Sequence, residues 1–169
     1  MRRIAVIFAG QLLLWLIMAE LNHLLTGTRV YLFVAALYVV HGAMLQPWRA
    51  GFTASLLAGL LCDSTSPVVF GTHLVLFAAA HVAVFHLRDR LPREDVAGNV
   101  VVMLLVNLGL FIVFSFTQVH HSPAPGAAWL RLAVDLLCSQ VFIALVTPWF
   151  FALQARALVL AQVERENFA

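Results

Sequence analysis

Residues 97–118 read AGNVVVMLLVNLGLFIVFSFTQ, a run of mostly apolar side chains without a single charged residue. About 20 such residues cross the hydrocarbon core of a bilayer as a helix, because each residue adds about 1.5 Å of length. The rest of the chain has the same character, since 63% of its 169 residues are hydrophobic and 11% are charged. A water-soluble domain carries about 25% charged residues. The sequence therefore predicts an integral membrane protein.

Six apolar stretches predict an all-α, polytopic membrane bundle of six helices. Only helices and closed barrels satisfy the backbone in lipid, and these stretches lack the alternation of barrel strands. We expect residues 1–169 to form one integral membrane domain, with a short third span before a Pro/Gly break and a cytoplasmic tail at 155–169. The six expected spans are 4–24, 30–46, 50–63, 71–87, 97–118 and 127–154.

The positions of the arginines predict the orientation of this bundle. All ten basic residues are arginine, and eight of them fall on the side of the predicted bundle that holds the amino terminus. Because cytoplasmic loops carry the excess of basic residues, we expect both termini in the cytoplasm and residues 120–126 outside. Only Arg29 and Arg131 are then near the outer surface. The eight inner arginines are Arg2, Arg3, Arg49, Arg88, Arg90, Arg93, Arg156 and Arg165.

The third stretch carries a stripe of small residues that ends in a carboxylate. Gly51, Ser55, Gly59 and Asp63 recur every four residues and so share one helix face. Small residues let another helix approach closely, and we expect the first three to pack against a helix or a partner protein. For Asp63, two interpretations stay open. It caps the Pro67-containing break by accepting from the amides of residues 64–66, or its charge contacts a ligand, an ion or a partner.

The last stretch repeats the spacing of four with Arg131, Asp135 and Ser139. Arg131 and Asp135 are expected to pair within one helix near the outer interface, or else to line the interior of the bundle. Further along, Pro148 predicts a kink or a change of packing.

The remaining polar residues show no catalytic or metal-binding pattern. The seven histidines lack ligand spacing, and the two cysteines lie far apart in apolar stretches. Phosphate-binding glycine loops and nucleophile elbows are also missing from the sequence. We expect no enzyme activity, cofactor, metal site or nucleic-acid partner, and interpret the scattered polar positions as hydrogen-bonding sites between helices. These positions include Gln11, Trp15, Asn22, Asn99, Met103 and Asn107.

Residues 59–63, GLLCD, are followed by GTH at 71–73 and by an apolar helix that ends in RDR at 88–90. This pattern resembles the MreD family of bacterial rod-shape-determining proteins. Members of the family have about this length, about six spans, cytoplasmic termini and a proline in the last span, where this chain has Pro148.

The resemblance implies a non-enzymatic scaffold in the bacterial inner membrane. Such a scaffold belongs to the elongation complex that builds the lateral cell wall, with MreC, the actin-like MreB, the RodA glycosyltransferase and its penicillin-binding transpeptidase as partners. It implies no catalytic residue. Gly59, Asp63 and Gly71 are expected to shape the bundle or its contact surface.

Two other functions remain open. The substrate-binding S-component of an energy-coupling-factor vitamin transporter is also a small six-helix membrane protein, and MreD looks like a fold relative of it. S-components dock on their transport partner through an Ala-x-x-x-Ala patch in the first helix, where this chain has Ala5 and Ala9. The third interpretation is a small channel or ion carrier that uses Asp63 and Asp135.

Overall fold

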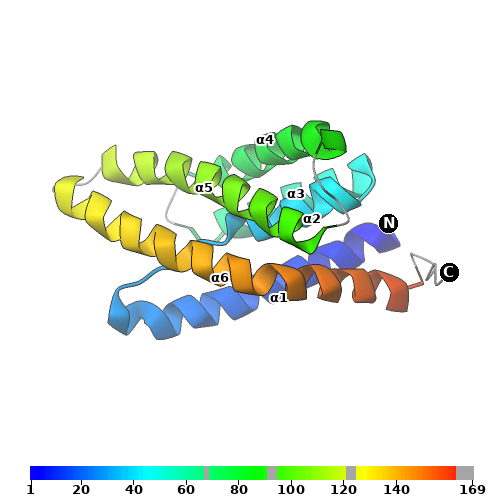
Figure 1. Ribbon diagram of the computed structural model, residues 1–169, viewed down its shortest axis with the longest axis horizontal. Helices are drawn as coiled ribbons and strands as arrows, with labels where there is room; N and C mark the ends of the chain where they lie inside the picture. Colours follow the sequence, from blue (N-terminus) through cyan, green and yellow to red (C-terminus); the bar gives the residue numbers. More distant parts are fainter. Residues whose placement is uncertain (67–68, 91–94, 121–124, 163–169) are drawn as a thin grey trace.

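The computed structural model describes residues 1–66, 69–90, 95–120 and 125–162, and within these ranges it is helical with no β-strand (Figure 1). The predicted all-α class is thereby confirmed. Pro67, Arg93, Arg165 and residues 121–124 of the predicted outer loop lie outside the described residues. The helices are α1 (Arg2–Leu25), α2 (Val40–Leu45), α3 (Trp48–Asp63), α4 (Thr72–Leu87), α5 (Val96–His120) and α6 (Pro125–Leu160), with 3₁₀ turns η1 (Thr26–Thr28), η2 (Ala35–Tyr38) and η3 (Arg88–Arg90).

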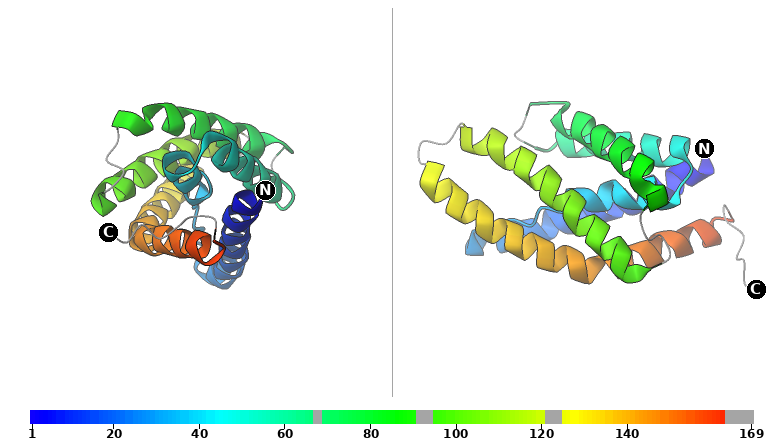
Figure 2. Two further views of the ribbon diagram at one scale, coloured as in Figure 1. Left: turned by 90° about the vertical axis from the view of Figure 1, so that its right-hand side faces the viewer. Right: turned by 45° about the horizontal axis from the view of Figure 1, so that its top comes forward.

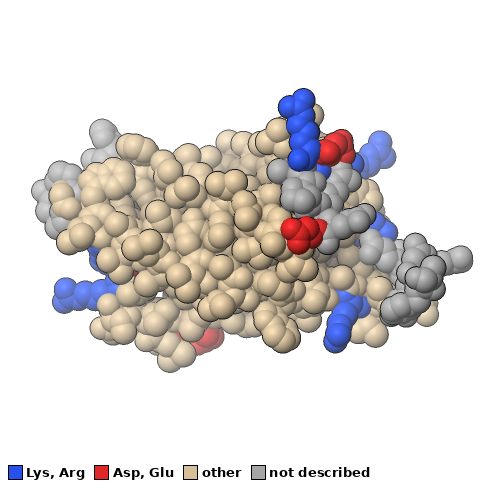
Figure 3. Space-filling view, viewed as in Figure 1, with Lys and Arg blue, Asp and Glu red and all other residues tan. Residues whose placement is uncertain are grey.

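Three helical segments of the described chain are long and apolar enough to cross a membrane: Arg2–Thr28, Val96–Phe116 and Ala128–Leu160. On the face shown in Figure 3, the charged side chains lie toward the two ends of the molecule and leave a broad uncharged band between them. Both features are those of a membrane protein. The helices α3 and α4 have 16 residues each, which is about 24 Å of helix and short for a 30 Å core. Six complete spans therefore stay a prediction.

The second predicted span, 30–46, is not one helix. Residues 30–34 have no regular structure, η2 follows, and α2 begins only at Val40. Ala36, Val39 and Ala43 are fully buried. In the end-on view of Figure 2, the other helices surround this part of the chain. Most of its apolar side chains face protein, which hydropathy alone does not distinguish from facing lipid.

The other helices pack in pairs around this central segment. α3 packs along α4, α5 packs along α6, and α1 contacts both α3 and α6. Pro47 separates α2 from α3, because a proline pushes the preceding residue out of the helical conformation, and Gln46 is indeed extended with ψ 156°. The start of α1 and the end of α6 lie at the same end of the molecule (Figure 1).

The last helix is longer than predicted. α6 has 36 residues, about 54 Å, and includes Pro148 within its length. It continues to Leu160, so that the first residues of the predicted tail at 155–169 are helical.

Candidate functional site

Asp63, the last residue of α3, holds the start of α4. One of its carboxylate oxygens accepts the backbone N–H of His73 at 2.9 Å and lies 2.9 Å from Nδ1 of the same histidine, while the other accepts the backbone N–H of Leu74 at 3.0 Å. The first amides of a helix have no partner within it and favour a negative charge. Asp63, only 4% exposed, thus caps α4 from a neighbouring helix.

The partners of Asp63 are not the amides of residues 64–66 that the sequence predicted. The amide of Ser64 donates to the Leu60 carbonyl, and the amides of Thr65 and Ser66 donate to the Cys62 carbonyl. Since these amides continue the hydrogen bonding of α3, the carboxylate is free to reach the helix that follows the break.

Two glycines complete the joint between α3 and α4. A methyl group at Gly59 would lie 2.7 Å from Cα of Leu74 and 2.9 Å from its nitrogen, so the absence of a side chain lets α3 approach the first turn of α4. Gly71 precedes that turn with φ +96°, a conformation that other residues rarely adopt. The glycines and Asp63 therefore act on one feature, the start of α4.

The small-residue stripe packs inside the chain. A methyl group at Gly51 would overlap the carbonyl oxygen of Gly42 in α2 and lie 2.9 Å from Cε1 of His81 in α4. The hydroxyl of Ser55 lies 3.0 Å from Nδ1 of His81. Gly51, Ser55 and Gly59 are all buried against helices of this chain, so that the stripe packs against helices, the first of the two expectations. Gly42, its counterpart, was not singled out in the sequence because a lone glycine in an apolar run carries no signal.

Two asparagines hold the irregular part of the central segment. Asn22 of α1 accepts the Leu32 amide at 2.8 Å and donates to the Leu32 carbonyl at 3.1 Å. Asn107 of α5 accepts the Ala36 amide at 3.3 Å and donates to the Phe33 carbonyl at 3.1 Å. Each amide side chain replaces hydrogen bonds that a helix would have supplied, as a water-free interior requires.

Asp135 binds the backbone of the same segment and is not paired with Arg131. Its Oδ1 accepts the Tyr31 amide at 2.9 Å, and one turn later Ser139 accepts the Phe33 amide at 2.8 Å. Asp135 is 5% exposed, whereas Arg131 is exposed, and the two described side chains form no ion pair with each other. The predicted ion pair between Arg131 and Asp135 is therefore wrong. Asp135 faces the interior of the bundle, and Arg131 is exposed.

Replacing Asn107 with leucine should lower the free energy of unfolding by about 2 kcal/mol, because the buried amide of Ala36 and the partly buried carbonyl of Phe33 lose their partner. Ser115→Ala is the matched control on the same helix, since the Ser115 hydroxyl is buried without a hydrogen-bond partner in the described structure. Thermal unfolding of the purified variants in detergent compares the two. Equal losses of stability would contradict the role assigned to Asn107.

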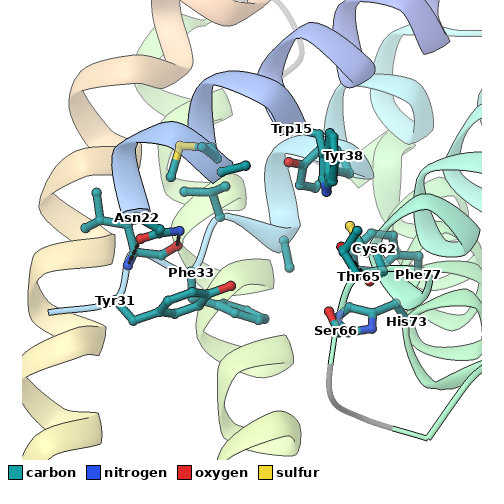
Figure 4. A pocket seen from close by; sticks show the side chains of 15 residues that line it. Trp15, Asn22, Tyr31, Phe33, Tyr38, Cys62, Thr65, Ser66, His73 and Phe77 are labelled. Carbon is teal, nitrogen blue, oxygen red and sulfur yellow. Dashed lines mark hydrogen bonds between the residues drawn. The ribbon is translucent and has the colours of Figure 1, made fainter. Parts of the chain in front are cut away.

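A cavity of about 360 Å³ opens between α1, the central segment and the α3–α4 joint. In Figure 4, Cys62, Ser66 and His73 face it from one side, and Asn22 and Tyr31 from the other. His73 therefore links the buried carboxylate of Asp63 to this space. The aromatic side chains that line the cavity are Trp15, Tyr31, Phe33, Tyr38 and Phe77.

The buried histidines pack against aromatic rings, and some of them also form hydrogen bonds. His41 packs edge-on against the rings of Phe150 and Phe151, and His81 lies beside Trp48. Among the described residues, no three histidine, cysteine, aspartate or glutamate side chains are close enough to hold a metal ion.

Comparisons with known proteins found no matching family model, no similar curated protein and no similar solved structure.

Proposed function

We propose that this protein is an MreD-like scaffold subunit of the bacterial cell-elongation complex. In this role it lies in the inner membrane, catalyses no reaction, and supports lateral cell-wall synthesis together with MreC and MreB. Its neighbours in the complex are the RodA glycosyltransferase and the penicillin-binding transpeptidase.

One observation carries the proposal. Gly59 and Asp63 of α3 and Gly71 of the connection to α4, which carry the resemblance to MreD, all act on the start of α4. Glycine, leucine and aspartate are common enough for such a motif to arise by chance in an apolar chain. What supports the resemblance is that each of the three residues has a distinct role in one structural joint: a close helix approach, a cap and a left-handed turn. A joint that fixes two helices relative to each other suits a subunit whose function is to present a rigid surface.

The proposed orientation places both termini in the cytoplasm. Arg3 donates to the Gln46 side chain and Arg88 to the Gln46 carbonyl, each at 3.4 Å. The amino terminus, the turn between α2 and α3 and the end of α4 therefore share one arginine-rich end of the bundle. A concentration of arginines at one end supports a cytoplasmic position for it.

Depleting the protein from its own bacterium tests the proposal. We expect rod-shaped cells to become wide and round, and an affinity-tagged copy to purify with an MreC-like protein that spans the membrane once. Re-expression of the untagged chain should restore cell width. Depleted cells that keep their shape, with no MreC-like protein recovered, would contradict the scaffold role.

The S-component of a vitamin transporter is the second candidate, favoured by two observations. Ala5 and Ala9 are both exposed on α1, as a docking patch would be, and the bundle contains an aromatic cavity of about 360 Å³. If this candidate is right, the tagged protein purifies with a membrane coupling subunit and paired ATPases, and depletion lowers vitamin uptake without changing cell shape.

A further inference from the structure

A second hollow adjoins the aromatic cavity at the end of the bundle opposite the termini. Its volume is about 370 Å³. Asn22 and Tyr31 line both spaces, so the two hollows share a wall. The residues that line the second hollow are Asn22, Thr26, Arg29, Val30, Tyr31 and Arg131.

Two arginines from distant parts of the chain face this hollow. Arg29 follows η1 in a left-handed conformation, φ 59°, and Arg131 projects from the first part of α6. Both are exposed, and neither has an ion-pair partner in the part of the chain that the structure describes. Asp135, one turn after Arg131, is buried and already accepts the Tyr31 amide. Two guanidinium groups without carboxylate partners can bind a phosphate, which matches their hydrogen-bonding geometry.

The position of the arginines indicates a lipid as the source of this phosphate. Arg29 directly follows one candidate span, Arg2–Thr28, and Arg131 lies near the start of another, Ala128–Leu160. Span ends lie where lipid phosphates lie, and arginine side chains reach toward that depth. A free anion would leave the neighbouring aromatic cavity filled with water, whereas an acyl or isoprenoid chain would cover its apolar rings.

We propose that this end of the bundle binds a phosphate-headed lipid. The phosphate lies between Arg29 and Arg131, and part of the apolar chain passes Asn22 and Tyr31 into the cavity lined by Trp15, Tyr38 and Phe77. The inference is independent of the proposed function, because it rests on the two hollows alone.

Native mass spectrometry of the purified full-length protein in detergent tests this site. The probes are dioleoyl phosphatidic acid, dioleoyl phosphatidylcholine and inorganic phosphate. We expect the phosphatidic acid to bind at least about tenfold more tightly than the phosphatidylcholine, a difference that corresponds to one power of ten in the dissociation constant. Equal binding of the two lipids would overturn the proposal. So would displacement of phosphatidic acid by inorganic phosphate at the same concentration, since the ligand would then be a free anion.

Matched variants separate the headgroup from the chain. Arg29→Gln with Arg131→Gln should abolish the preference for phosphatidic acid, while Arg2→Gln with Arg156→Gln, which removes two exposed arginines at the opposite end, should keep it.

Ala19→Trp places a large side chain at the aromatic cavity and should weaken lipid binding, while Ala9→Trp, on the same helix away from the cavity, should not. All six positions are exposed, so that thermal unfolding is expected to match the parent protein and to report any variant that fails to fold. If the arginine variant still prefers phosphatidic acid, or if Ala19→Trp binds like the parent, the proposed site is wrong.

Discussion

Asp63→Leu is expected to lower the free energy of unfolding by on the order of 3–6 kcal/mol, which is enough to unfold many proteins. The leucine removes the acceptor of two backbone amides, those of His73 and Leu74, and of the His73 ring nitrogen. The Asp63 side chain is fully buried, so these donors would be left without an acceptor. The measurements are the amount of folded protein recovered from membranes and its thermal unfolding in detergent.

Asp63→Asn separates the shape of this residue from its charge. Asparagine keeps one of the two acceptor oxygens, so the variant should fold with a smaller loss of stability. Restored cell shape in the asparagine variant would make Asp63 a structural cap, and loss of rescue at a normal protein level would mean that the charge itself is used. Ser64→Ala is the control, since Ser64 is exposed and, among the described residues, its hydroxyl donates to the Leu61 carbonyl alone. A leucine variant as stable as the parent would refute the cap.

Gly51→Ala is expected to destabilise the protein by more than about 2 kcal/mol, although it adds only one methyl group. That methyl would overlap the carbonyl oxygen of Gly42 and lie 2.8 Å from its carbonyl carbon. Backbone atoms cannot rotate away as a side chain does, so α2 and α3 would have to separate. Because α2 lies at the centre of the bundle, this movement would disturb every helix that packs on it.

Gly109→Ala is the matched control for Gly51→Ala. A methyl group at Gly109 meets no atom within 4 Å, and alanine is the better helix former by about 1 kcal/mol. The control should therefore be neutral or stabilising in thermal unfolding. If both alanine variants lose stability equally, the close contact between α2 and α3 does not exist in the folded protein.

Local patterns were enough to predict the helical class, the three long apolar helices and the packing of the small-residue stripe against a helix. Hydropathy over a window of residues decides whether a segment is compatible with lipid, and a spacing of four places residues on one helix face. Gly51, Ser55 and Gly59 share such a face, and the structure buries it. Likewise Gln11, Asn22 and Asn107 were predicted to make hydrogen bonds, because an amide in an apolar stretch needs a partner.

The identity of the partners was decided only by the tertiary structure. Asp135 pairs with the amide of Tyr31, 104 residues earlier, and not with Arg131 on its own helix. Asp63 bonds amides ten and eleven residues away across a break, instead of those that follow it directly. Both outcomes have the same physical basis. The Tyr31 amide lies in a segment without regular structure, and the His73 and Leu74 amides lie in the first turn of α4, so that none of the three has a partner within a helix and a carboxylate supplies one. Composition shows that residues 30–46 are apolar, but only the packing of five other helices determines whether that stretch faces lipid or protein.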